Sequence, residues 1–96
     1  MVKYKKGVPT DVPSEKLLNG RAIIENVYKR YWDQDLVITS TKDGKHRKGS
    51  KHYKVPREAE DLRFPDQFRA FMWALKLELG TDFDLVLEGD HIHYEI

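Results

Sequence analysis

Apolar residues recur at helical spacing in two stretches of the chain. The first stretch predicts a helix over residues 14–32, with Ser14 as its N-cap and fraying or a kink at Asn19-Gly20. The second predicts a helix that opens at Pro65 and stops at Gly80. Its apolar stripe comprises Phe68, Phe71, Met72, Leu75 and Leu79, widened by Trp73 and Leu77. Both stripes are expected to pack in the core.

Shorter stretches of β-prone residues predict strands, at residues 36–40, 59–64, 83–87 and 91–96. Gly89-Asp90 fits a two-residue hairpin turn of the type that starts with glycine. Helices and strands in this order predict an α+β fold, in which two main helices pack on one side of a small, mostly antiparallel sheet. We expect a single domain over residues 1–96, with residues 1–13 as an extended lead-in.

Alternation along two of the strands assigns their faces. Asp61 shares a face with Ala59 and Arg63, whereas Leu62 and Phe64 point to the core. In the last strand the apolar face carries Ile92, Tyr94 and Ile96, and the polar face carries His91, His93 and Glu95. The imidazoles of this strand are therefore expected to point away from the helices.

Charge is distributed unevenly along the 96 residues. Residues 1–57 hold 14 Lys and Arg against 6 Asp and Glu, and residues 58–96 hold 3 against 10, which indicates attraction between the two halves. Residues 42–57 form a loop by composition, with seven Lys and Arg, two His and one acid. A loop of this composition is also typical of a domain that binds nucleic-acid phosphates, although it has no base-reading motif and few aromatic residues.

The chain contains no cysteine, so a zinc site would have to use histidine and carboxylate ligands. His52 and Asp61 lie in and just after the basic loop, and further imidazoles lie close to the last residue. Two histidines and one carboxylate are a common ligand set for a zinc ion that keeps one position open for water. This set predicts a hydrolytic metal site.

Three motifs carry a resemblance to a known family. They are Ser50-x-His52, then Ala59-x-Asp61-Leu62-Arg63, then Asp90-x-x-His93-Tyr94-Glu95. In this order they resemble the zinc D-alanyl-D-alanine carboxypeptidase and L-alanyl-D-glutamate endopeptidase family of peptidoglycan peptidases, which includes phage endolysins and has the Hedgehog/DD-peptidase fold. The resemblance covers roughly residues 17–96 and also includes Ile38-Thr39-Ser40 before the loop.

The resemblance implies a role for each matching residue. His52, Asp61 and His93 would hold one zinc ion per chain, and Asp90 would be the general base acting on the water that zinc activates. The substrate would be a peptidoglycan stem peptide, cleaved at a D-Ala-D-Ala, L-Ala-D-Glu or cross-bridge amide. A monomer is expected, with no membrane or nucleic-acid partner.

The sequence departs from the family pattern in two places. Asp61 lies nine positions after His52 where the family has seven, and Val55-Pro56-Arg57 fills the place of the family glycine. An insertion of two residues keeps the parity of the strand and is able to bulge outward without moving a ligand. The family arginine after Thr-Ser is also missing. Candidate substitutes for it are Arg63, Arg47 and Lys42, and Ser50 is a further candidate for binding substrate.

Other interpretations stay open at this stage. Glu88-x-x-His91, two positions before Asp90-x-x-His93, is an alternative pair of general base and metal ligand. His46 belongs to no motif and is expected to be a surface residue. The chain is also compatible with a non-catalytic domain of the same fold that binds peptides or the cell wall. No signal peptide or membrane-spanning run is visible. We therefore expect the protein to be synthesised in the cytoplasm. From there it would either be released to the cell wall by a separate lysis or export system or be part of a virion.

Overall fold

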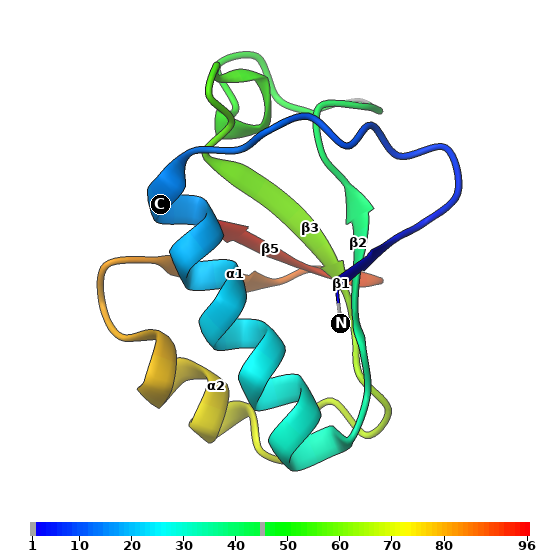
Figure 1. Cartoon of the computed structure of the whole chain (residues 1–96), viewed down its shortest axis with the longest axis vertical. Coiled ribbons are helices and arrows are strands. Elements are labelled where there is room, and N and C mark those ends of the chain that lie inside the picture. Colours follow the sequence, from blue (N-terminus) through cyan, green and yellow to red (C-terminus); the bar gives the residue numbers. More distant parts are fainter. Residues whose placement is uncertain (1, 45) are drawn as a thin grey trace.

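A computed structural model describes residues 2–44 and 46–96, and its helices and strands are shown in Figure 1. The elements are β1 (Val2–Tyr4), α1 (Glu15–Val27), the π-helix η1 (Tyr28–Trp32), β2 (Leu36–Ser40), the 3-10 helix η2 (Lys51–Tyr53), β3 (Ala59–Arg63), α2 (Met72–Leu79), β4 (Asp84–Leu87) and β5 (His91–Glu95). None of the described helices has the length and apolar character that crossing a bilayer requires.

The five strands form one mixed sheet in the order β1-β2-β3-β5-β4. β1 pairs with β2 in parallel, and the other neighbours are antiparallel. The α+β class predicted from the sequence is confirmed. Within the lead-in that was predicted to be extended, residues 2–4 form a parallel edge strand of the sheet. The sheet is therefore larger and more mixed than predicted.

One hydrophobic core lies between the sheet and the helices. Figure 1 shows α1 crossing one face of the sheet with α2 beside it. From the sheet, Leu62, Ile92 and Tyr94 are fully buried in this core, as the alternation predicted. The remaining buried members are Leu17, Ile24, Val27, Tyr28, Leu36, Ile38, Met72, Ala74, Leu75 and Leu79. Alternate residues of β3 and β5 are thus left to the opposite face.

Helical structure spans residues 15–32, close to the first predicted helix, but its irregularity lies elsewhere. The α-helix runs unbroken through Gly20 and gives way to π-helix at Tyr28. The predicted kink at Asn19-Gly20 was wrong, because Gly20 is used for close packing. A Cβ there would lie 2.6 Å from the Tyr94 hydroxyl oxygen and 2.7 Å from the Phe83 ring.

Gly20→Ala is expected to destabilise the fold by about 1–3 kcal/mol, the usual cost of overpacking a filled core. The added methyl group must displace Tyr94, whose hydroxyl donates to the Leu17 carbonyl. Urea unfolding of the variant measures the loss, and Gly89→Ala is the control because a Cβ there meets nothing within 4 Å. Equal stability of the two variants would contradict this packing.

The second predicted helix was wrong at its start. α2 begins at Met72, because Gln67 and Phe71 adopt positive φ angles of 52° and 63° that interrupt a helix. Asp66 instead exchanges two hydrogen bonds with the Gln34 side chain, at 2.7 and 2.8 Å. The predicted widening of the apolar stripe was also wrong, since Trp73 and Leu77 are 60% and 74% exposed.

A buried ion-pair network fixes β3 beneath α1. Glu60 is fully buried and accepts hydrogen bonds from the Arg21 guanidinium at 2.9–3.1 Å. Arg57 is also buried; it donates to both Asp11 carboxylate oxygens at 3.2 Å and to the Ala59 carbonyl at 2.8 Å. The network ties the N-terminal segment and α1 to the strand that carries Asp61.

Candidate metal centre

The candidate site is built on the face of the sheet opposite the helices. The register of β3 and β5 places Asp61 opposite His93 and Arg63 opposite His91. Paired residues of an antiparallel ladder point to the same face, so the Asp61 carboxylate and both imidazoles meet there. The sequence-based assignment of faces is confirmed.

His52 reaches this face from the segment between β2 and β3. It lies in η2, where the Ser50 side chain accepts a hydrogen bond from the His52 backbone N–H at 3.2 Å. The longer connection to β3 bulges into solvent, with Val55 96% exposed, while His52 itself is buried. The extra residues therefore do not separate His52 from Asp61: the distance from His52 Nε2 to Asp61 Oδ1 is 3.2 Å.

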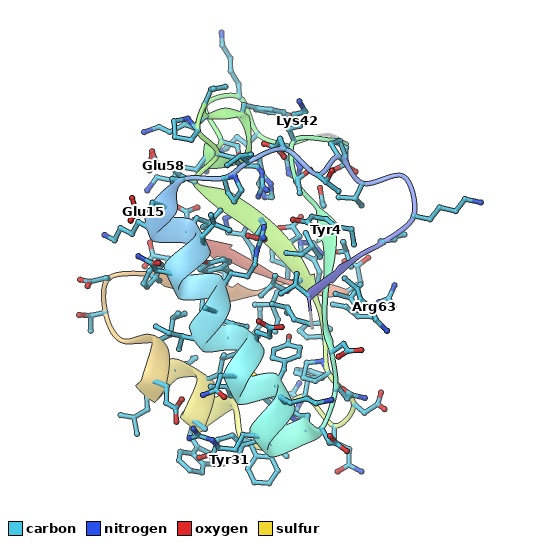
Figure 2. All side chains as sticks on the ribbon, in the orientation of Figure 1. Tyr4, Glu15, Tyr31, Lys42, Glu58 and Arg63 are labelled. Carbon is cyan, nitrogen blue, oxygen red and sulfur yellow. The ribbon has the colours of Figure 1, made fainter. Side chains whose placement is uncertain are left out.

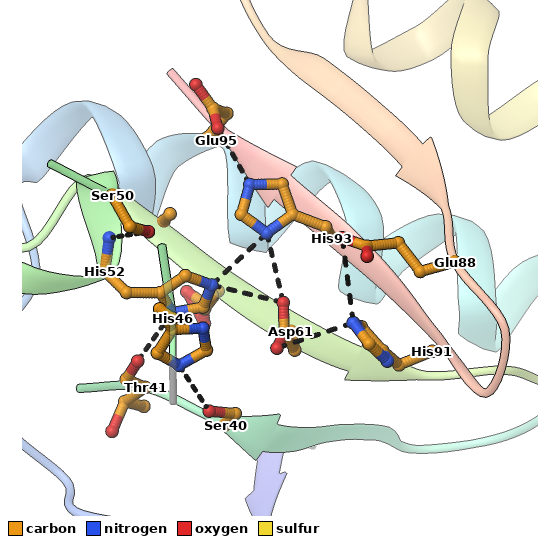
Figure 3. Close-up of polar contacts among 12 residues, drawn as sticks. Ser40, Thr41, His46, Ser50, His52, Asp61, Glu88, His91, His93 and Glu95 are labelled. Atoms are coloured by element: carbon orange, nitrogen blue, oxygen red, sulfur yellow. Dashed lines mark hydrogen bonds and ion pairs between the residues drawn. The ribbon is translucent and has the colours of Figure 1, made fainter. Parts of the chain in front are cut away.

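Three potential ligand atoms converge at this point (Figure 3). His52 Nε2 lies 3.2 Å from His93 Nδ1, and His93 Nδ1 lies 3.1 Å from Asp61 Oδ1. Ligands held about 2.0–2.1 Å from a tetrahedral zinc ion lie about 3.3–3.4 Å from one another. The three atoms are thus spaced nearly as one face of a zinc tetrahedron requires.

The far nitrogen of each imidazole is held by an acceptor. His52 Nδ1 lies 2.5 Å from the Thr41 carbonyl oxygen, and His93 Nε2 lies 2.8 Å from Glu95 Oε1. Lys51 holds that Glu95 carboxylate at 3.3 Å. Because each far nitrogen donates its hydrogen outward, the inner nitrogens present lone pairs to Asp61, as metal-binding histidines do.

Converging lone pairs and a carboxylate require a positive charge between them. The hydrogen bond with Asp61 raises the pKa of His93 to about 9, and the bond with Glu95 adds to this effect. Burial disfavours the charge on Asp61, yet the hydrogen bonds with His52 and His93 hold the pKa of Asp61 well below its usual range. Below about pH 9, a proton on His93 would therefore balance these charges whenever no cation is bound.

The structure also brings in His46, which the sequence analysis treated as a surface residue. Its ring stacks on that of His52, with centroids 3.6 Å apart and planes 6° from parallel. One ligand atom each from His46, His52 and Asp61 lie within 4.8 Å of one another, and this group can hold a metal ion. No motif pointed to His46, since only the folding of the loop over His52 places it here.

The site opens into a cavity of about 830 Å³. One wall carries His46, Arg47, Ser50 and Lys51, and the other carries Val86, Leu87, Glu88 and His91. Of the four predicted substrate-binding residues, Arg47 and Ser50 line this cavity. Among the described residues, Lys42 and Arg63 are not part of its wall, and Figure 2 shows them at separate places on the surface.

The turn between β4 and β5 holds the two candidate bases. The Glu88 backbone N–H donates to the His91 carbonyl at 2.9 Å, so Gly89 and Asp90 form the predicted two-residue connection. The turn type differs from the prediction, because Gly89 does not have the positive φ angle of a turn that starts with glycine. The Asp90 side chain is 93% exposed, and its Oδ1 accepts from His91 Nδ1 at 2.5 Å. Glu88 Oε1 lies 3.8 Å from His91 Nε2, at the cavity. His91 Nε2 lies 3.6 Å from Asp61 Oδ2.

Comparison with protein-family models, with curated proteins and with solved structures finds no match to this chain. The resemblance to zinc peptidases therefore rests on the three sequence motifs alone. The geometry of His52, Asp61 and His93 is independent of that resemblance. It supports a metal centre whatever the family.

Zinc affinity is expected to fall with decreasing pH below about 9. In that range zinc displaces a proton from His93, so the apparent affinity should drop about tenfold for each pH unit. Competition with a chelator across about pH 7–10 measures this slope. Glu95→Gln removes one cause of the raised pKa of His93. The pH below which the zinc affinity of this variant begins to fall should therefore be lower than in the wild-type protein. An affinity that does not change between pH 7 and 9 would contradict the proton between these ligands.

Proposed function

We propose that the protein is a zinc-dependent peptidase that hydrolyses an amide bond in peptidoglycan stem peptides. The observation that carries the proposal is the convergence of His52 Nε2, Asp61 Oδ1 and His93 Nδ1 within 3.1–3.2 Å at an open cavity. A closed structural zinc site has four protein ligands, whereas three ligands at a cavity are typical of a catalytic one.

The donor set fits zinc better than a hard cation. Two imidazoles and one carboxylate suit a borderline ion, whereas calcium and magnesium take six or more ligands, mainly oxygen. When bound, zinc supplies Lewis-acid activation of water and of the scissile carbonyl. The His52 and His93 rings are fixed by Thr41 and Glu95, so the site is oriented before an ion binds.

The cavity has the polarity that a peptide substrate requires. Arg47 and Lys51 stand on one wall and favour a substrate carboxylate, which supports Arg47 as a substitute for the missing family arginine. Val86 pairs with His93 and so shares its face; it is half-exposed on the opposite wall and offers apolar contact. A short peptide with a free carboxylate can lie between these walls, across the metal centre.

A carboxylate of the turn between β4 and β5 would take a proton from the attacking water and pass it to the leaving amine. The resemblance assigns this role to Asp90. The geometry favours Glu88, because Glu88 lines the cavity, whereas the Asp90 carboxylate is held on the outer nitrogen of His91. Asp90 would then act by orienting His91.

Glu88→Gln is therefore expected to keep zinc and to lower turnover by about 10²–10⁴-fold, the usual contribution of a positioned acid–base group. Asp90→Asn, the matched control in the same turn, should cost less, since its side chain is almost fully exposed. Turnover of a stem peptide and zinc content are measured for both variants. The reverse order of losses would restore the assignment of Asp90 as the base.

Mass spectrometry of purified peptidoglycan fragments tests the proposed activity. With zinc-loaded protein, each hydrolysed bond should give two fragments whose masses add up to that of the substrate plus one water, and these masses identify the bond. Asp61→Asn is the matched inactive control, because it replaces the carboxylate that both histidines contact. Unchanged fragments after incubation with zinc-loaded wild-type protein would overturn the proposal, even if the metal binds.

A further inference from the structure

The three proposed ligands leave the fourth position of a tetrahedral metal ion open, and His46 lies close to that position. Figure 3 shows His93 above the gap between His52 and Asp61, and His46 beside the His52 ring on which it stacks. A metal ion in this gap would lie between His93 and the stacked pair. A ring nitrogen of His46 lies within 4.8 Å of the ligand atoms of His52 and Asp61. To act as a tetrahedral ligand, this nitrogen would have to come up to about 1.5 Å closer, and the ring would have to turn so that the nitrogen points at the ion.

The His46 ring is held at this place rather than projecting from the surface. Ser40 Oγ lies 3.0 Å from His46 Nε2, and the Tyr53 hydroxyl accepts from the His46 backbone N–H at 2.8 Å. The stack on His52 keeps the ring close to the metal position, but an ion in the plane of the His52 ring lies off the plane of the parallel His46 ring, so His46 would have to turn out of the stack to bind it. Ser40 holds His46 in one position, and a bound metal ion would offer it a second.

We propose that His46 is a fourth protein ligand of the metal ion and that a bound peptide must displace it. The inference rests on the proposed function, because it concerns the same ion. In the resting protein four side chains, from His46, His52, Asp61 and His93, would saturate a tetrahedral ion. The substrate carbonyl or water gains access when His46 returns to Ser40. The loop that carries His46 thereby limits the reactivity of the centre.

X-ray absorption at the zinc edge counts the imidazole ligands and tests this directly. Wild-type protein loaded with one zinc should show three imidazoles, and His46→Ala and His46→Gln should show two with an added oxygen ligand. Arg47→Ala is the matched control, since it alters the neighbouring side chain of the same loop and should keep three. Zinc affinity of His46→Ala should fall by at least the 10–100-fold that loss of a supporting group costs.

A zinc-binding hydroxamate gives a second readout of opposite sign. It must displace His46 in the wild-type protein but not in His46→Ala, so the variant should bind hydroxamate more tightly while holding zinc more weakly. Two imidazoles in wild-type protein, or equal hydroxamate affinity in both proteins, would overturn the inference and leave the proposed function standing. A wild-type protein that takes up no zinc would overturn both.

Discussion

Replacing His93 with alanine is expected to abolish stoichiometric zinc binding, with a larger loss than any change outside the ligand set. His93 Nδ1 is 3.1–3.2 Å from the other two proposed ligand atoms. Its removal leaves His52 and Asp61 in place, with only His46, whose ring would have to turn out of its stack on His52, to complete the site. Glu95→Gln keeps the imidazole and removes only the charge behind it. That variant should bind one zinc with about 10–100-fold lower affinity.

His91→Ala is the matched control for this experiment. It removes an imidazole from the same face of β5, two residues away, whose Nε2 contacts Asp61 only at 3.6 Å. Zinc content after dialysis, measured for the three variants, should therefore be none for His93→Ala and one per chain for the other two. Loss of zinc in His91→Ala with retention in His93→Ala would show that the alternative motif, Glu88-x-x-His91, supplies the metal ligand.

Replacing Glu60 with glutamine is expected to destabilise the fold by about 3–5 kcal/mol, the cost of breaking a buried ion pair from one side. The substitution leaves the Arg21 guanidinium buried without its partner and removes the nearby negative charge, at 3.9 Å, from Arg57. Urea unfolding monitored by tryptophan fluorescence measures the free energy of unfolding.

Glu58→Gln is the control on the same stretch of chain. Its partner Lys54 lies at 3.1 Å but is largely exposed, so this pair should contribute no more than about 1 kcal/mol. A Glu60→Gln protein as stable as the control would show that the network is not needed for the fold. Because Glu60 precedes Asp61 on β3, a destabilised variant should also hold zinc more weakly.

Local alternation was sufficient to predict the parts of the site that lie on strands. The period of two placed Asp61 on the polar face of β3 and His93 on the polar face of β5, and the register confirms both. A strand allows only two orientations for a side chain, so the pattern of Leu62 and Ile92 decides the orientation of the charged residues beside them. This part of the chain needed no tertiary information.

Loops and buried charges could not be predicted in this way. His46 reaches the site only because the basic loop folds over His52, a contact between segments with no periodic pattern. Arg21 and Glu60 are charged residues, a class that is seldom buried, yet they pair across 39 positions inside the core. The start of α2 depends on the left-handed backbone at Phe71, which tertiary packing imposes on an apolar residue.

Anomalous diffraction at the zinc edge, from crystals of the zinc-loaded protein, tests the central claim most directly. The account predicts one strong peak about 2.0–2.2 Å from His52 Nε2, Asp61 Oδ1 and His93 Nδ1, at the floor of the cavity. A peak bound instead by His91 and Glu88, or no peak between the three predicted atoms, would contradict it.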